Sequence, residues 1–247
     1  MRCLAAAPLA LLGLLASCAP PSVLPAEGRE SVVRSLSRQP RYLRVAVYVG
    51  PFFGDGSRVL LTDRPISELS LLESPGGQPI LPPAPTRILP PAPTRILPPG
   101  TPVFVDSVQF PTGATLWSRP VTTPRYNPWL LASVEGERRP AVLVLSSESQ
   151  SAEDVVAEVG RVLTSDDPAP VFAALPEPVR DAIREKALVE GMTRQAAAMA
   201  WGYPDRIVMD RPTQSEEWFW TGGNRRAAFQ DDRLVRHDSV KALPKTR

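Results

Sequence analysis

The sequence predicts an α+β protein, with strands in its first half and helices followed by further strands in its second half. Three observations support this class. Apolar and polar residues alternate over residues 42–49, as they do in half-buried strands, and residues 103–110 are a further strand candidate. Apolar side chains recur at helical spacing over 151–163 and again over 176–201. Short strand patterns separated by turn residues then follow at 206–209, 217–220, 225–229 and 233–236.

The first 17 residues have the pattern of a secretory signal peptide. Arg2 supplies one positive charge before an apolar run from Leu4 to Leu15, which is shorter than the roughly 20 residues that span a bilayer. The run ends in Leu15-Ala16-Ser17-Cys18, which resembles the lipobox of bacterial lipoproteins. This resemblance implies lipid transfer to Cys18, cleavage before it and acylation of the new N-terminus, with palmitate as the expected fatty acid. An ordinary signal peptide cut at another small residue is the alternative.

The same resemblance implies a cellular location. Asp directly after the lipidated cysteine retains lipoproteins of Gram-negative bacteria in the inner membrane, and this chain has Ala19 there. We therefore expect a chain that is lipid-anchored in the cell envelope, in the outer membrane and facing the periplasm. A mature lipoprotein carries three acyl chains, and these would hold it firmly, since one chain alone binds a membrane only marginally.

Composition narrows the function. The chain has 28 Lys and Arg against 26 Asp and Glu, so it lacks the positive field that nucleic-acid binding requires. Of its two cysteines, Cys3 leaves with the signal peptide and Cys18 is acylated, so no disulfide is expected. His237 is the single histidine, which is too few for the usual zinc sets. We expect no enzyme activity, no cofactor, no metal and no nucleic-acid partner, although composition leaves open catalysis by carboxylates alone.

Proline marks two segments of the N-terminal half. Residues 18–40 contain four prolines among scattered Ser, Arg and Glu, and this predicts a lipidated tether. Residues 80–87 read Ile-Leu-Pro-Pro-Ala-Pro-Thr-Arg, residues 88–95 repeat them, and a third copy starts at Ile96. The resulting Pro-rich arm, residues 79–99, favours polyproline II. It is either a spacer or ligand for an aromatic groove, or a neutral duplication in an exposed loop.

Short strands with Pro and Gly turns predict a β-rich domain over residues 41–147. We expect a small β-barrel or a rolled antiparallel sheet, faintly similar to the Src-homology-like barrels of bacterial envelope proteins. Tyr126 and Trp129 lie in a turn-rich stretch of this domain. They either line a groove for a peptide or other ligand or plug the end of the barrel.

A helix over 151–163 follows, within a predicted helix-and-linker segment, residues 148–176. Ser151 is its expected N-cap and Asp154 the reciprocal partner of a capping box. The next helix opens at Pro176-Glu177-Pro178 and is expected to end at Gly191.

The C-terminal segment, residues 177–240, carries the most specific fold signal. Thr193 is the expected cap of a helix over 194–201, and Gly202-Tyr203-Pro204 stops it. Four strands follow. The residues that carry a resemblance are Gly191-Met192-Thr193, Gln195, Trp201-Gly202-Tyr203-Pro204, Trp218-Phe219-Trp220 and Phe229-Gln230-Asp231-Asp232-Arg233-Leu234.

Over residues 177–237 this pattern is similar to the BamE (SmpA/OmlA) lipoprotein family. The resemblance implies two helices on an antiparallel sheet of three or four strands, and a non-enzymatic role supporting a β-barrel assembly machine at the outer membrane. The chain departs from the family pattern at Trp220, where Tyr or Phe is usual, and at Asp232, where Gly is usual.

These features predict a membrane-anchored scaffold or accessory factor that works through contacts with an envelope protein. The candidate partner surface is Tyr203, Trp218 and Trp220, together with Tyr126 and Trp129, because aromatic residues anchor interfaces. Packing of Trp218 and Trp220 under the helices is the alternative. A lipoprotein that binds a ligand, peptide or glycan through the β-rich domain is the alternative function.

Overall fold

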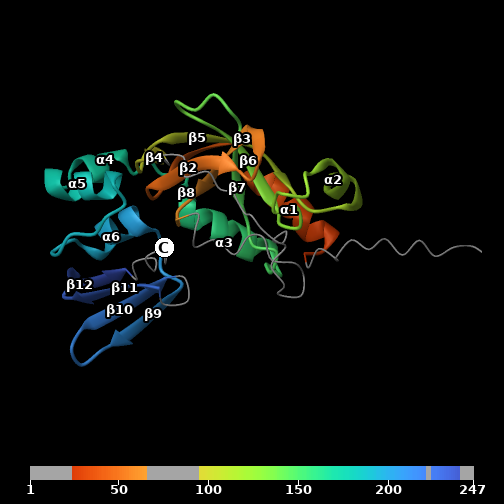
Figure 1. Cartoon of the computed structure of the whole chain (residues 1–247). Helices are drawn as coiled ribbons and strands as arrows, with labels where there is room; N and C mark the ends of the chain where they lie inside the picture. Colours follow the sequence, from red (N-terminus) through yellow and green to blue (C-terminus); the bar gives the residue numbers. More distant parts are fainter. Residues whose placement is uncertain (1–23, 66–94, 221–223, 240–247) are drawn as a thin grey trace, which may run out of the picture.

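A computed structural model describes residues 24–65, 95–220 and 224–239 of the chain. Its architecture is mixed α and β, with one large sheet, one small sheet and six helices in the described part (Figure 1). The helices are α1 (Ala26–Leu36), α2 (Gly113–Ser118), α3 (Ala152–Val162), α4 (Ala169–Ala173), α5 (Glu177–Arg184) and α6 (Arg194–Trp201). The strands of the large sheet are β1 (Gln39–Leu43), β2 (Val47–Phe52), β3 (Asp55–Thr62), β4 (Arg95–Leu97), β5 (Pro102–Gln109), β6 (Trp129–Val134), β7 (Ala141–Val144) and β8 (Leu163–Thr164). The strands of the small sheet are β9 (Arg206–Asp210), β10 (Ser215–Trp220), β11 (Arg225–Gln230) and β12 (Arg233–Ser239).

The large sheet is open, with the strand order β4-β2-β3-β7-β6-β5-β1-β8. Its neighbours are antiparallel except β3 and β7, which are parallel. Within the described chain its end strands β4 and β8 do not pair with each other, so the expectation of a small closed barrel is wrong. The sheet still bends strongly, because β1 and β2 are only three residues apart and yet lie near opposite ends of the strand order.

The break between β1 and β2 corrects the single strand predicted over 42–49. Arg44 donates its backbone N–H to the carbonyl of Val162, and Ala46 donates to that of Met199, at 2.7 Å in both cases. These hydrogen bonds run to the ends of α3 and α6 rather than to a neighbouring strand. The alternating pattern is continuous in the sequence, but the backbone changes partners within it.

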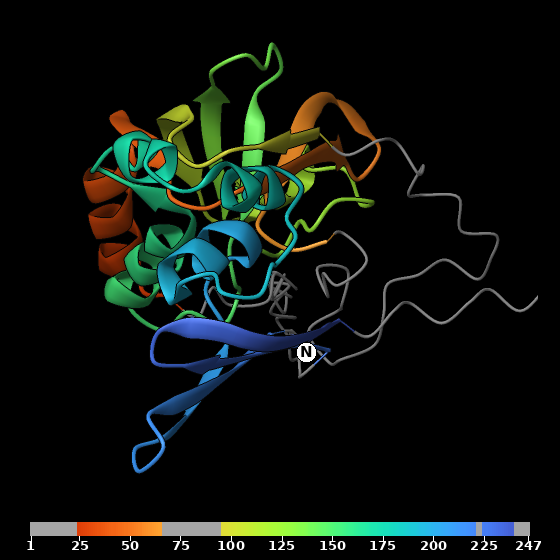
Figure 2. The ribbon, with the colours of Figure 1, turned by 90° about the vertical axis from the view of Figure 1, so that its left-hand side faces the viewer.

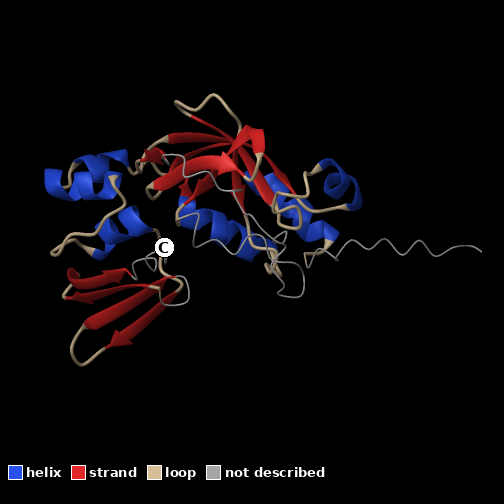
Figure 3. Ribbon diagram, viewed as in Figure 1, coloured by secondary structure: helices blue, strands red, loops and turns tan. Residues whose placement is uncertain are grey.

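One face of the large sheet is covered by α1 and α3 (Figure 3). Val32 and Leu36 of α1 and Val155 and Val159 of α3 are buried there with the inward residues of the strands. Residues 26–40, which were expected to be tether, are therefore α1 and the start of β1. The i, i+4 pair Val32 and Leu36 gives this helix its buried stripe.

The opposite face of the sheet buries a smaller apolar cluster. It contains Phe52, Leu60, Trp129 and Val142. Leu60 lies on this face because its neighbours Val59 and Leu61 point to the helix-covered one, as alternation along a strand requires.

The helix predictions for the second half are largely confirmed. Ser151 and Asp154 form the expected capping box of α3. Thr193 caps α6, accepting a hydrogen bond from the Ala196 N–H. However, α5 ends at Arg184, well before Gly191, and α4 forms within the expected linker. The small sheet is an antiparallel meander of four strands, order β12-β11-β10-β9.

Several predictions lie outside the described residues: the signal peptide, Cys18 and the Pro-rich arm up to residue 94. The end of that arm is described and forms β4, an edge strand whose Ile96 packs against the core of the C-terminal unit. In the ranges that are described, no helix has both the length and the apolar character needed to cross a membrane.

Candidate functional site

Helix α6 joins the two sheets. All residues from 196 to 201 are buried, so the helix is enclosed on every side by the small sheet, α5 and the β1–β2 connection. Three of its first four buried residues are alanines, which let the surrounding backbone approach closely. Figure 2 shows α6 between the small sheet and the rest of the molecule.

Lys186 lies at the centre of this joint. It adopts a left-handed conformation (φ 53°) just after α5, and its side chain is buried. The ammonium donates hydrogen bonds to the carbonyl oxygens of Ala46 (2.6 Å) and Ala200 (2.8 Å) and lies 5.0 Å from the centre of the Tyr48 ring. Burial lowers the pKa of Lys186 to about 7, against the opposing effect of the negative charge of Asp63.

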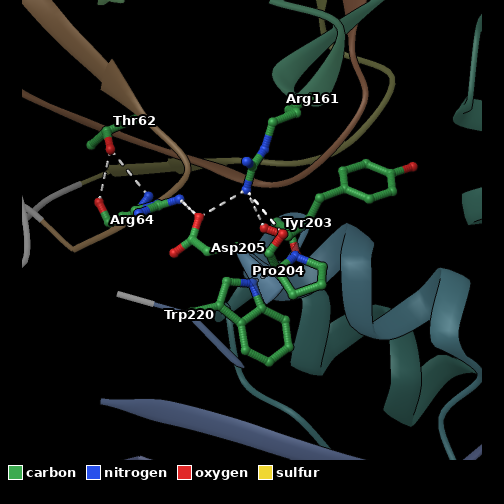
Figure 4. Close-up of polar contacts among 8 residues, drawn as sticks. Thr62, Arg64, Arg161, Tyr203, Pro204, Asp205 and Trp220 are labelled. Carbon is green, nitrogen blue, oxygen red and sulfur yellow. Dashed lines mark hydrogen bonds and ion pairs between the residues drawn. The ribbon is translucent and has the colours of Figure 1, made fainter. Parts of the chain in front are cut away.

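A second polar contact clamps the segment that leaves α6 (Figure 4). Arg64, just after β3, and Arg161 of α3 both pair with the carboxylate of Asp205, the latter at 3.3 Å. Arg161 also donates to the carbonyl oxygen of Tyr203 at 2.6 Å. On the other side, the indole N–H of Trp220 donates to the carbonyl of Gly202 at 3.1 Å. Residues 202–205 are therefore held from both sheets.

Gly202 is required by this geometry. Its φ of +82° and ψ of 176° are open essentially only to glycine. In addition, a Cβ at this position would lie 2.6 Å from a carboxylate oxygen of Asp63.

The structure buries most of the aromatic residues predicted as a partner surface. Trp218 and Trp220 point from β10 into the core beneath α6, so their assignment to an exposed surface is corrected. Trp129 is also buried: its indole N–H donates to the Pro124 carbonyl and its ring contacts Phe52. Of the two interpretations left open for Trp129, burial therefore excludes a ligand groove and leaves packing in the apolar core of the large sheet.

The two predicted tyrosines remain half-buried and lie apart. Tyr203 packs against both cores, with the guanidinium of Arg44 5.0 Å from the centre of its ring. The guanidinium of Arg125 likewise lies 5.5 Å from the centre of the Tyr126 ring. The five predicted aromatic residues do not form one surface. Cys18 lies outside the described residues.

Sequence reasoning missed an exposed apolar surface on strand β9. All five residues of this strand are exposed, including Ile207, Val208 and Met209, the last of which is 58% accessible. β9 pairs only with β10 on one side, and no other strand in the described ranges pairs with its second edge. Its uninterrupted apolar run looked like a buried strand, and periodicity alone does not distinguish the two.

His237 lies on β12 with its ring 5.9 Å from that of Trp201. Over residues 24–65, 95–220 and 224–239, no three His, Cys, Asp or Glu side chains gather as metal ligands would. What the arrangement supplies is a rigid joint that presents a small sheet with an open edge.

No family model, no curated protein and no solved structure matches this chain, so its architecture and its exposed groups are the basis for a proposal about function.

Proposed function

We propose that this protein is a lipid-anchored envelope lipoprotein that acts as a non-enzymatic scaffold or accessory factor, binding an extended segment of another envelope protein along β9. The observation that carries the proposal is the exposed apolar edge of the small sheet. The anchor is Cys18, and the proposed location is the outer membrane, facing the periplasm.

Edge strands are ordinarily protected, because their unpaired N–H and C=O groups attract other strands. β9 has charged residues only at its ends, Arg206 and Asp210, and the three apolar residues between them are accessible. Such an edge is suited to β-augmentation, in which backbone hydrogen bonds supply affinity and side-chain contacts supply specificity. The guanidinium of Arg206 stacks on Phe219, 4.3 Å from the centre of its ring.

The resemblance to the BamE family supports the same role. It covers α5, α6 and the small sheet, where Thr193 caps a helix, Gly202 ends it, and Trp218 and Trp220 pack beneath it. The family's role in outer-membrane assembly is non-enzymatic, which agrees with a site whose accessible groups are backbone and apolar side chains. Burial of Trp129 removes the main support for ligand binding through the large sheet.

Site-specific cross-linking in cells tests the partner surface. A photoreactive amino acid replaces Val208 on β9 or Val235 on β12, the opposite edge strand; these valines are 45% and 49% exposed. We expect an adduct with a defined envelope protein from position 208 only, and its loss when Met209→Lys is added. Equal adducts from both positions, or none from 208, would contradict the proposal.

Metabolic labelling tests the anchor separately. Incorporation of a fatty acid should require Cys18, so Cys18→Ala should abolish the label and release the protein from the membrane fraction. Label that persists in Cys18→Ala would show that the lipid is attached elsewhere.

A further inference from the structure

The most exposed large apolar residue of the described chain lies far from β9, on α2. Trp117 is 90% accessible, and Val121, just beyond the helix, is 70% accessible. The capping box between Thr112 and Thr115 fixes α2, and Leu116 turns inward, so Trp117 is held outward. The other four tryptophans of the chain are buried. Trp117 and Val121 together give this end of the molecule an exposed apolar surface, and such surfaces often mark a contact with a partner or a membrane.

The segment that carries Trp117 and Val121 contributes no exposed charge, although Arg29, Glu30 and Arg34 of α1 lie beside its start. Between residues 111 and 124 the only charged residue is Arg119, and it is buried. Its guanidinium donates to the carbonyls of Gln109 (2.9 Å), Arg125 (2.8 Å) and Asn127 (2.8 Å) and lies 3.9 Å from the centre of the Trp129 ring. The charge of Arg119, which would oppose insertion into the hydrocarbon of a membrane, is therefore buried and holds the loop after α2 in place.

The loop is also rigid. Thr123 donates its hydroxyl to the Pro120 carbonyl, and Arg125 donates to the Leu116 carbonyl at 2.9 Å. If Trp117 and Val121 were buried in a membrane or against another protein, the backbone would therefore lose little conformational entropy.

The position of α2 relative to the lipid anchor favours the membrane over another protein. An open hollow of about 540 Å³ is lined by α1, from Ala26 to Arg34 and including Glu30, and by the start of α2 with its cap, Thr112 and Thr115, so the two helices lie side by side. Cys18 precedes Leu24 by six residues, which reach at most about 20 Å at 3.3–3.6 Å per residue. A lipid on Cys18 would keep this end of the molecule against the bilayer. In Figure 1, α1 and α2 lie at the end opposite the small sheet.

We propose that Trp117 and Val121 form a second membrane contact, inserting into the phospholipid leaflet that holds the Cys18 anchor. This inference rests on the proposed lipidation. Tryptophan favours the membrane interface, where its ring is buried and its N–H reaches water or headgroups. The contact would fix the orientation of the anchored protein and direct β9 away from the membrane. On the same side, Arg34 pairs with Glu30 at 3.7 Å, and Arg29 donates a hydrogen bond to the Leu24 carbonyl.

The test uses the chain from Cys18 onward, which contains every described residue and a single cysteine. Cys18 is coupled to a maleimide phospholipid in phosphatidylethanolamine–phosphatidylglycerol vesicles, so tethering does not depend on lipidation in cells. Emission of Trp117 is taken as the difference between the parent chain and Trp117→Phe. Failure of fatty-acid labelling in cells would count against the proposed anchor, whereas the vesicle result bears on the contact alone.

Lipids brominated on their upper acyl carbons should reduce the emission of Trp117 in the tethered protein roughly twofold or more, because an interfacial ring lies within their reach. Aqueous iodide should quench Trp117 in the untethered chain and much less after tethering. Val121→Ser should restore part of the iodide quenching. Val171→Ser, on the exposed side of α4, should leave it unchanged.

Emission that is insensitive to the brominated lipids, with iodide quenching equal before and after tethering, would overturn the proposal. That outcome would leave Trp117 facing water at the vesicle surface, as expected if its partner were a protein.

Discussion

The ammonium group of Lys186 lies 2.6 Å from the carbonyl oxygen of Ala46, and this hydrogen bond links the end of α5 to the β1–β2 connection of the large sheet. The same group reaches the Ala200 carbonyl on α6. One buried side chain therefore connects backbone from both structural units, and its protonation is coupled to their packing.

Stability should depend on pH through Lys186. Burial lowers its pKa from 10.5 to about 7, against the opposing effect of the negative charge of Asp63. Below about pH 7 the group is protonated in both states, and the cost of burying the charge is fully present. Between about pH 7 and 10.5 the unfolded chain binds more protons, so the free energy of unfolding attributable to Lys186 rises with pH.

Urea unfolding of the parent chain and Lys186→Met across pH 6 to 10 isolates this contribution. Relative to the variant, the parent should gain up to about 4 kcal/mol over this range, since one pKa unit corresponds to about 1.4 kcal/mol. Parallel stability curves for the two proteins would show that Lys186 does not titrate differently on folding.

Gly202→Ala should destabilise the protein by about 2 to 4 kcal/mol, from backbone strain and overlap with Asp63. Adding Asp63→Ala should recover part of the loss by removing the overlap. Gly191→Ala is the matched control: its φ is also positive at +84°, but no atom lies within 4 Å of the added Cβ. It should cost only about 1 to 2 kcal/mol. Chemical unfolding measures all four proteins, and equal losses at the two glycines would refute the overlap.

Asp205→Asn should cost about 1 kcal/mol, because it removes the carboxylate that Arg64 and Arg161 share. The loss should shrink in 1 M salt, which screens partly exposed ion pairs. Asp181→Asn breaks an exposed pair with Arg184 on α5 and should change stability much less. Unfolding midpoints at low and high salt compare the two, and a larger effect at Asp181 would be inconsistent with the clamp.

Asp232→Gly should act in two directions. Asp231 and Asp232 both have positive φ, 49° and 61°, as in a type I′ turn, where glycine is preferred. The carboxylate of Asp232, however, accepts a hydrogen bond from Arg194 at 2.7 Å. In an Arg194→Ala background, we expect Asp232→Gly to stabilise the protein by about 1 kcal/mol, and the gain should be smaller in the parent chain. Four unfolding free energies complete the cycle; an identical gain in both backgrounds would remove the proposed role of Arg194.

Much of the fold could be read from local signals. The capping residues Ser151 and Thr193 and the turn at Asp231-Asp232 act within a few residues of themselves, so the sequence indicates them directly. α1 was missed because its buried stripe is only Val32 and Leu36, flanked by charges and preceded by Pro25. Its existence depends on α3, more than a hundred residues away.

The location of the exposed apolar surfaces depends on tertiary structure even more than the helices do. Trp218 and Trp117 have the same side chain, yet one is buried beneath α6 and the other is exposed on α2. β9 has the composition of a core strand but lies at an edge that no described segment covers. Which aromatic residue meets a partner is decided by what packs over it, and a single sequence does not contain that information in any local pattern.

The enclosure of α6 bears on how this protein could have been assembled from parts. A fragment beginning at α5 would expose the side of α6 that contacts Ala46. A fragment ending before α5 would lose Met199 and Lys186, the hydrogen-bond partners of Ala46 in the β1–β2 connection. We therefore expect neither half to fold alone. Calorimetry should show one cooperative transition, and recombination that exchanged the C-terminal half alone would have to supply a helix with small residues where α6 has Ala196–Ala198 and Ala200.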